Sequence, residues 1–481
     1  MSAIERKALL SGFQREMDSD SVALFIGAGM SRASGFVDWK GLMKEVADDL
    51  GLDINRETDL IALAQYHHNS RKTRHRINQL LVTEFTKGVT LTENHRLFAS
   101  LPISTIWTTN YDRLIEDAFT SAGKRVDVKR RQADLPITKP RADVTVYKMH
   151  GDVDAPDDAV LTKDDYATFE THRNLFSVQL RGHLVSKSFL FLGYSFSDPN
   201  IDYILARIRA QLGSNKREHY CIMRKVLKGP GMDEAEVHYQ TRKLTLRIED
   251  LQNYGIQTLL VDDYAEITDL LRDLKRRAVR RNVFISGSAH DPAPMTAAAL
   301  ESFSRALGRE IVRQDYNLIS GLGLGIGGAV TMGALEQLYS TPVVQLEERL
   351  TLRPFPQVAP SSGSRDDIWE RYRQDMISRA GFAAFIAGNR LDGSSGRTVD
   401  AQGVIREFEI AVAAGVYPIP IGATGSAAKA LSDKVLADPH AYYGSFGPSV
   451  LSYLQILADH SAGETAWIDA VIGILRTVAP K

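Results

Sequence analysis

The feature that most constrains this chain is a regular alternation of short apolar runs with longer amphipathic segments. Five runs rich in β-branched and aromatic residues are predicted to be buried strands: 22–26, 105–108, 145–148, 189–192 and 219–223. Segments with helical spacing of apolar residues lie between them, for example 38–50 and 198–212. Strands that alternate with helices form parallel sheets covered by those helices. We therefore predict the α/β class.

The pattern restarts near residue 281. Residues 266–281 are predicted to form a helix that ends in a cluster of Lys and Arg, and a new strand at 282–285 follows directly. The alternation then resumes, with further strands at 318–320, 383–386 and 416–419. We expect two Rossmann-like parallel-sheet domains, residues 1–281 and 282–481. The basic cluster fits a solvated helix end better than a nucleic-acid site.

Composition excludes several classes of function. Lys and Arg number 58 against 59 Asp and Glu, so the net charge of −1 gives no general reason to bind nucleic acid or an anionic membrane. The single cysteine, Cys221, excludes an intrachain disulfide and a Cys-x-x-Cys zinc ribbon. It also fits a reducing compartment.

Two uncharged stretches, 317–335 and 410–428, approach the roughly 20 residues that a membrane span requires. The first is rich in glycine, and the second contains Pro418 and Pro420, so both fit the strand, loop and helix of a soluble domain better. The first twenty residues mix charges of both signs and do not resemble a signal peptide. We expect a cytoplasmic protein that binds no membrane.

The predicted strand 22–26 runs into a glycine-rich turn that contains Gly27, Ala28, Gly29 and Ser31. Backbone N–H groups at such a turn can approach a pyrophosphate, and the dipole of the following helix favours negative charge. A tight turn packed beneath a helix would have the same sequence. The turn by itself leaves both interpretations open.

Polar residues also follow two other predicted strands. Asn110 and Asp112 come just after the strand 105–108, and His150 comes just after the strand 145–148. Ligands of open parallel sheets bind beyond the carboxyl ends of the strands. We therefore expect these side chains to lie near one binding site.

These motifs together resemble the signatures of the sirtuin family, over about residues 20–270. They are Gly27-Ala28-Gly29-Met30-Ser31, Thr109-Asn110-Tyr111-Asp112 and His150-Gly151. The resemblance implies an NAD pocket, to which we assign Ala28, Gly29, Ser31, Asp112, Gly193 and Ser195. Sirtuin deacylases also carry a zinc module held by four cysteines, which a chain with only Cys221 cannot build. We expect no zinc or other metal, no acyl-lysine groove, and NAD+ as the substrate with no further cofactor.

Within such a pocket, Asn110 and His150 are the predicted catalytic residues. Nicotinamide is a good leaving group, and the ribose can develop oxocarbenium character. Asn110 would hold the ribose or position water, and His150, with an ordinary pKa of about 6.5, would accept a proton from a ribose hydroxyl or from the water. Asp112 could contact the nicotinamide or the ribose, or could instead cap the helix 113–122.

The second half also has glycine-rich turns after strands, at 286–288 and 320–328. Their backbone donors can hold phosphates, although close helix packing accounts for some of these glycines. This half resembles the SLOG superfamily of nucleotide-binding domains. The enzymatic members carry a Pro-Gly-Gly-x-Gly-Thr-x-x-Glu signature, of which only the remnant 403–407 stands here. The resemblance therefore favours a sensor over a second hydrolase.

We assign an activator site in this half to Ser288, Gly323, Arg373, Arg390 and Glu407. The two arginines could pair bidentately with phosphates, and Glu407 could accept hydrogen bonds from ribose hydroxyls. Each of these charged residues, taken alone, also fits a surface ion pair.

A sirtuin-like domain followed by a SLOG domain, with the motifs at 108–115, 147–152 and 196–200, resembles the NAD-hydrolysing effectors of the Thoeris antiphage system. That resemblance implies a cyclic ADP-ribose isomer as the activator, made by a TIR-domain partner and bound by the SLOG domain. It further implies a homotetramer, NAD+ depletion and abortive infection. The alternatives are a protein deacylase or ADP-ribosyltransferase, and a non-catalytic nucleotide-binding module.

Overall fold

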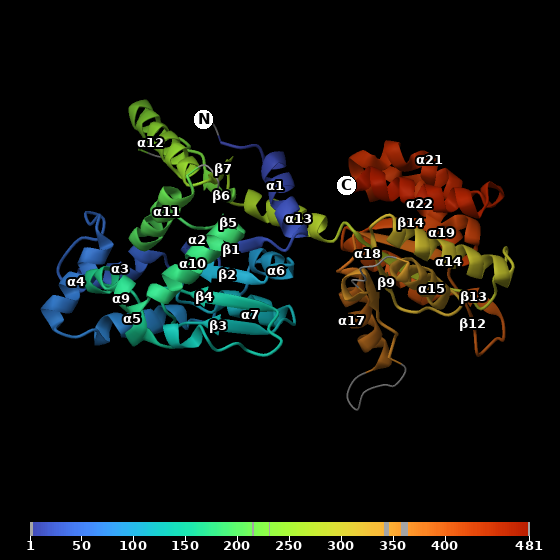
Figure 1. Cartoon of the computed structure of the whole chain (residues 1–481), viewed down its shortest axis with the longest axis horizontal. Coiled ribbons are helices and arrows are strands. Elements are labelled where there is room, and N and C mark those ends of the chain that lie inside the picture. Colours follow the sequence, from blue (N-terminus) through green and yellow to red (C-terminus); the bar gives the residue numbers. More distant parts are fainter. Residues whose placement is uncertain (1–2, 214–215, 230, 341–345, 357–363, 480–481) are drawn as a thin grey trace. The chain divides into compact units, whose positions relative to one another are not determined.

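The protein is described by a computed structural model that covers residues 3–213, 216–229, 231–340, 346–356 and 364–479. The chain divides into two compact units, Met1–Ala278 and Val279–Lys481 (Figure 1). The division falls where helix α13 (Glu266–Ala278) ends, close to residue 281 of the sequence prediction. The first unit is called unit 1 below and the second unit 2.

Unit 1 is built on a parallel sheet of seven strands in the order β3-β4-β2-β1-β5-β6-β7. The chain leaves β1 to one side for β2 and to the other side for β5, so the strand order reverses at β1. The carboxyl ends of β1, β2, β4 and β5 therefore lie side by side. The strands are β1 (Val22–Ile26), β2 (Thr105–Thr108), β3 (Val126–Lys129), β4 (Val144–Lys148), β5 (Ser188–Leu192), β6 (His219–Arg224) and β7 (Ile256–Val261).

The central strand β1 is buried along its whole length because both faces of the sheet are covered. Every second residue of β1, namely Val22, Leu24 and Ile26, belongs to an apolar cluster with α1, α6, α7 and α13. Phe25, which points to the opposite face, belongs to a cluster with α10, α11 and the end of α12. This period of two is the geometry of a strand with two packed faces. It explains why the strand appears in the sequence as a continuous apolar run.

A third apolar cluster of unit 1 joins α3, α4 and α5 to the loops that follow β2 and β4, through Tyr111, Val153 and Leu161. In Figure 1 these helices gather with α9 beside the sheet. The helices of unit 1 are α1 (Arg6–Asp18), α2 (Ala28–Arg32), α3 (Trp39–Asp49), α4 (Leu60–Arg71), α5 (His75–Phe85), α6 (Glu93–Ser100), α7 (Leu114–Ser121), α8 (Lys163–Ala167), α9 (Phe169–His172), α10 (Asn174–Ser186), α11 (Pro199–Leu212), α12 (Glu234–Asn253) and α13, with 3-10 turns at Gln132–Asp134 and Pro156–Asp158.

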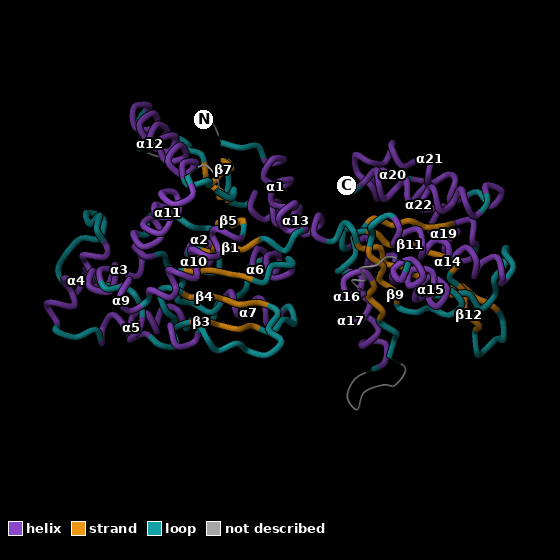
Figure 2. Tube along the Cα trace, viewed as in Figure 1, coloured by secondary structure: helices purple, strands orange, loops and turns teal. Residues whose placement is uncertain are grey.

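Unit 2 is built on a parallel sheet of five strands in the order β10-β9-β8-β11-β14, and β12 and β13 form a separate antiparallel hairpin. The strand order reverses at β8, the first strand of this unit. Figure 2 shows the strands of each unit as a layer among helices. The strands are β8 (Asn282–Ser288), β9 (Asn317–Ser320), β10 (Leu350–Leu352), β11 (Phe382–Ala387), β12 (Asn389–Leu391), β13 (Thr398–Asp400) and β14 (Tyr417–Ile421).

One apolar core holds unit 2 together, and it includes β11, whose six residues are all buried. Within it α14 packs on α15, and α21 packs on α22. The helices are α14 (Ala297–Arg313), α15 (Gly327–Tyr339), α16 (Leu346–Arg349), α17 (Arg365–Ile377), α18 (Gln402–Ala413), α19 (Ser426–Ala437), α20 (Pro439–Tyr443), α21 (Gly447–Ala458) and α22 (Glu464–Val478), with 3-10 turns at Gly422–Thr424, Gly444–Phe446 and His460–Ala462.

The predicted α/β class with two parallel sheets is confirmed, and every strand predicted from the sequence is present to within one or two residues, except β8, which continues to Ser288. The sequence analysis missed the edge strands β3, β7 and β10 and the two hairpin strands β12 and β13. The helix predicted over 266–281 ends earlier, at Ala278. Among the described residues no helix is both long and apolar enough to cross a membrane.

The turns after β1 and β5 touch backbone to backbone. Gly27 N donates to Leu192 O at 2.9 Å, and Gly29 N donates to Gly193 O at 2.9 Å. A Cβ on Gly27 would lie 2.5 Å from Gly193 O, and Gly193 itself adopts φ +63°. The sequence therefore needs glycine on both sides of this contact.

Gly27→Ala should lower the free energy of unfolding by about 1–3 kcal/mol, because the new methyl group meets backbone that cannot rotate away. Urea unfolding followed by circular dichroism measures the change. Gly182→Ala in α10 is the matched control, since a Cβ there has nothing within 4 Å and alanine favours the helix. Equal stability of the two variants would contradict the close contact.

Candidate functional site

Three polar residues from two strand ends of unit 1 form one buried cluster. Ser31 Oγ donates to Asp112 Oδ2 at 2.7 Å, and Asn110 Nδ2 donates to Ser31 Oγ at 2.9 Å. The backbone N–H of Asn110 is held by Thr108 Oγ1 at 2.9 Å, so the start of the loop is fixed as well. The structure thus brings together the residues that the sequence analysis placed after β1 and β2.

Asp112 connects this cluster to helix α7. Its Oδ1 accepts from the backbone N–H of Leu114 at 3.0 Å, while Oδ2 holds Ser31. Asp112 thus contacts the first residue of α7 but does not occupy its N-cap position, which is Arg113. Both carboxylate oxygens are therefore occupied by the protein itself.

His150 follows β4 and is almost fully buried, with 3% of its surface exposed. Its ring lies against the edges of Tyr166 and Phe169, with centroids 5.5 and 6.0 Å away. Burial lowers the pKa of His150 below its ordinary value, and the nearby Asp198 carboxylate only partly offsets this. The neutral imidazole is thus favoured near neutral pH, which is the form that can accept a proton.

Two polar atoms of the site have no hydrogen-bond partner within the described protein. They are Asn110 Oδ1 and His150 Nε2, both buried. His150 Nε2 lies 3.1 Å from Asp198 Oδ2 but at an angle that makes no hydrogen bond. Buried polar groups normally find a partner, so these two atoms are suited to contacting a bound ligand.

Lys148, the last residue of β4, is fully buried beneath the site. Its Nζ lies 2.8 Å from Asp152 Oδ2 and 3.2 Å from Glu116 Oε1, and it donates to the carbonyl oxygens of Tyr111 and Asp112. Burial lowers the pKa of Lys148, but Glu116 and Asp152 more than offset this, so the pKa lies above its ordinary value. The ammonium thus ties the loop after β2 to the loop after β4.

The glycine-rich turn differs from the phosphate-binding expectation. The N–H groups of Gly27 and Gly29 are used by backbone carbonyl oxygens, and α2 is only five residues long. Ala28 and Gly29 are exposed, as is Ser195, whose Oγ lies 2.7 Å from Ser197 Oγ. These contacts favour the interpretation of Gly27 and Gly29 as a tightly packed turn, and a phosphate contact at this turn stays a prediction.

In unit 2, Glu407 of α18 is buried and bonded to two neighbours. Ser286 Oγ of β8 donates to its Oε2 at 2.5 Å, and Arg373 Nε of α17 lies 3.4 Å from its Oε1. Burial raises the pKa of Glu407, an effect that Ser286 and Arg373 reduce. The Arg373 guanidinium also lies over the rings of Phe355 and Trp369, at 5.2 and 5.7 Å.

The other predicted residues of unit 2 lie around a second polar centre, Asn389. Ser288 Oγ donates to Asn389 O at 2.9 Å, while Asn389 Oδ1 accepts from His290 N and Asp291 N. Gly323 packs on the end of β8, where a Cβ would lie only 1.9 Å from Gly287 O. Arg390 is exposed on the β12–β13 hairpin.

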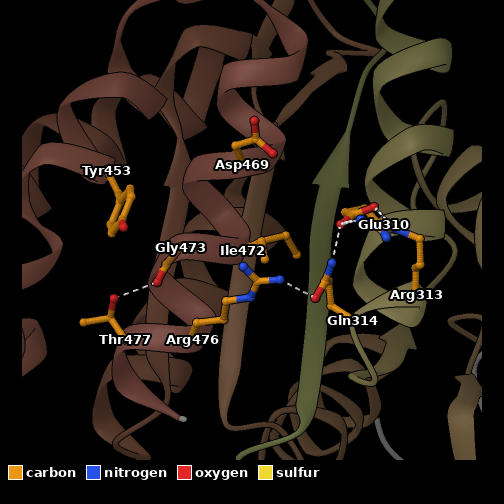
Figure 3. Close-up of a pocket in the computed structure, with 9 residues that line it drawn as sticks. All are labelled: Glu310, Arg313, Gln314, Tyr453, Asp469, Ile472, Gly473, Arg476 and Thr477. Carbon is orange, nitrogen blue, oxygen red and sulfur yellow. Dashed lines mark hydrogen bonds and ion pairs between the residues drawn. The ribbon is translucent and has the colours of Figure 1, made fainter. Parts of the chain in front are cut away.

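A cavity of about 560 Å³ in unit 2 does not contain these residues. It is lined by side chains of α14, α21 and α22 and their ends, including Gln314, Tyr453 and Arg476 (Figure 3). Arg476 Nη2 donates to Gln314 Oε1 at 2.6 Å, so this charge already has a partner. The cavity therefore does not coincide with the predicted activator site.

Sequence reasoning missed Lys148, Asp198 and Asn389 as site residues. Asp198-Pro199 signals a helix start, but nothing in the sequence places its carboxylate beside His150. A lysine at a strand end was the only available signal for Lys148. Among the described residues, no group of three or more His, Cys, Asp or Glu side chains is placed to hold a metal ion.

Comparison with known proteins identifies the family. A model of the SIR2-like domain matches residues 104–249, and a model of the Sir2- and TIR-associating SLOG family matches residues 266–478. The chain is 44% identical to the NAD(+) hydrolase ThsA of Cytobacillus dafuensis, over 99% of this chain and 97% of that protein. It belongs to the ThsA family of NAD(+) hydrolases.

Other ThsA proteins are also similar to this chain over nearly its whole length. Identity is 43% with ThsA of Bacillus cereus (strain MSX-D12), over 90% of each chain. Identity is 40% with ThsA of Acinetobacter baumannii (strain 532279), over 92% of this chain and 93% of that protein. The ThsA similarity extends over both units, so the resemblance seen in the sequence motifs is confirmed for sirtuin-like and SLOG domains in this order.

Lys148→Met should lower the free energy of unfolding of unit 1 by about 3–5 kcal/mol, because it leaves the buried Glu116 carboxylate without its cation and Asp152 with Arg130 alone. Thermal and urea unfolding measure the loss. Lys225→Met is the control, since Lys225 pairs with Asp262 at the surface and should tolerate the change. A Lys148 variant as stable as this control would show that the buried ammonium does not hold the loops.

Proposed function

We propose that this chain hydrolyses NAD+ to nicotinamide and ADP-ribose in unit 1. The observation that carries the proposal is a pair of buried groups at the carboxyl ends of β2 and β4: the Asn110 amide, whose Oδ1 has no hydrogen-bond partner among the described residues, and the His150 imidazole, whose pKa burial lowers. They lie beside the point where the strand order reverses, which is where open sheets bind nucleotides. Full-length similarity to proteins named NAD(+) hydrolases supports the same activity.

The geometry supports a simple division of roles. Ser31 and Asp112 fix the Asn110 amide, so that its carbonyl oxygen can hold a ribose hydroxyl or the attacking water. His150, kept neutral by burial, can take a proton from that hydroxyl or from the water. The four-cysteine zinc module of deacylases cannot form with Cys221 alone, which favours water over an acyl-lysine as the acceptor.

His150→Ala and Asn110→Ala should each reduce NAD+ cleavage by about 10²-fold or more, since a general base or a positioning group is lost. Chromatographic assay of free nicotinamide and ADP-ribose measures the rates, and circular dichroism checks folding. His172→Ala, at an exposed position of α9, serves as the control. Wild-type nicotinamide release by either variant would remove that residue from the reaction.

We also propose that unit 2 senses a cyclic ADP-ribose isomer. Arg373 offers a cation for phosphate and Glu407 an acceptor for ribose hydroxyls, and Ser286 joins them to the end of β8. The proposed context is antiphage defence in the cytoplasm, with the signal made by a TIR-domain partner and NAD+ depletion as the response. A homotetramer is the proposed assembly. The name of the matching SLOG family, which refers to Sir2 and TIR association, supports this context.

Arg373→Gln should raise the concentration of cyclic ADP-ribose isomer needed for half-maximal NAD+ cleavage at least tenfold, because a charge-assisted phosphate contact is lost. Each linkage isomer is titrated at fixed NAD+, and calorimetry measures its binding. Arg371→Gln, exposed on the same helix, is the control. An unchanged activation curve and unchanged affinity would place the sensing site elsewhere.

A further inference from the structure

Asp198 contacts two different parts of unit 1 through its two carboxylate oxygens, and the proposed mechanism does not use it. It is the N-cap of α11, where its Oδ1 accepts from the backbone N–H groups of Asn200 at 2.9 Å and Ile201 at 3.2 Å. Capping fixes the carboxylate at the N-terminal end of a fourteen-residue helix. Its other oxygen is left for a different contact.

That second oxygen faces His150. Oδ2 lies 3.1 Å from His150 Nε2, and the Asp198 side chain is only 9% exposed. The two groups come from distant parts of the chain, one from the loop after β4 and the other from the first turn after β5. An anion at this distance from an imidazole, shielded from water, interacts with it strongly.

None of the other groups described around His150 places a negative charge beside its imidazole. The rings of Tyr166 and Phe169 make T-shaped contacts with the imidazole. The cation Arg173 also acts on His150, but its guanidinium donates to the backbone carbonyl oxygens of Arg130, Met149 and Asp158. Asp198 therefore supplies the negative charge that acts most strongly on the histidine.

We propose that Asp198 is a positioning residue that holds the His150 imidazole in place and stabilises the imidazolium formed when His150 takes up a proton. The inference rests on the proposed function of His150. Because the positive charge of an imidazolium is shared by both ring nitrogens, the carboxylate acts whichever nitrogen receives the proton. Helix α11 thereby contributes to the reaction through its cap, without touching substrate.

The sign of the pH effect follows from the opposing influences on His150. Burial lowers the pKa of His150, and Asp198 raises it. Removing the Asp198 charge leaves the effect of burial on His150 less opposed, so the pKa of His150 falls further. A base is active when deprotonated, so the acidic limb of the kcat/KM profile should move to lower pH. The plateau should fall as well, because a weaker base accepts the proton less readily.

Asp198→Asn tests the proposal in the full-length protein, since asparagine keeps the cap and removes the charge. Asp198→Ser, a second capping residue without charge, covers the case in which the asparagine variant does not fold. Asp233→Asn is the matched control, because Asp233 caps α12 by accepting from Glu236 N at 2.7 Å and is exposed. For each protein, kcat and KM for NAD+ cleavage are measured across pH.

A second measurement does not depend on activity. Nuclear magnetic resonance of isotope-labelled histidine, assigned with His150→Gln, follows the titration of His150 directly. We expect its pKa to fall by about one unit or more in Asp198→Asn and Asp198→Ser and to stay unchanged in Asp233→Asn. We expect kcat to fall about 10- to 100-fold with little change in KM, as for other carboxylates that orient a functional histidine.

The outcomes separate the two proposals. Unchanged His150 titration and an unchanged kcat profile in the uncharged Asp198 variants would reduce Asp198 to a helix cap and overturn the inference. If the wild-type protein released no nicotinamide under any condition, the proposed function would fail instead. The resonance titration would then still decide whether Asp198 acts on His150.

Discussion

The buried ammonium of Lys148 is the interaction on which the arrangement of unit 1 depends. It is fully enclosed and is held by Asp152, Glu116 and the carbonyl oxygens of the loop that carries Asn110. A charge placed in such surroundings is tolerated only when its partners stay in place. The loops after β2 and β4 are therefore fixed relative to each other, and with them the distance between Asn110 and His150.

The carboxylates around this centre are engaged with the protein itself. Asp112 bonds to Ser31 and Leu114, Asp152 to Lys148 and Arg130, and one oxygen of Asp198 to α11. Asn110 Oδ1 and His150 Nε2 are among the buried side-chain atoms that make no hydrogen bond within the described residues. A site whose dipoles are already oriented needs little rearrangement when charge develops on a substrate.

The sequence could predict what depends on local pattern. Central strands appear in the sequence as continuous apolar runs. The expectation that the polar residues after β2 and β4 lie near one site follows from the rule that the carboxyl ends of parallel strands meet at the same edge of a sheet. The pairing of Arg373 with Glu407 also brings together two residues assigned to one site. Contacts between distant segments could not be predicted, such as Asp198 with His150 or the four hydrogen bonds of the Asn389 side chain. They depend on the relative placement of loops, which no local pattern specifies.

The backbone contact between the turns after β1 and β5 restricts how this protein could be re-engineered. Positions 27, 29 and 193 cannot be diversified one at a time, because a side chain on either turn displaces the other turn. Ala28 and Ser195 stand on the same two turns and are exposed, so they offer places where variation leaves the scaffold intact.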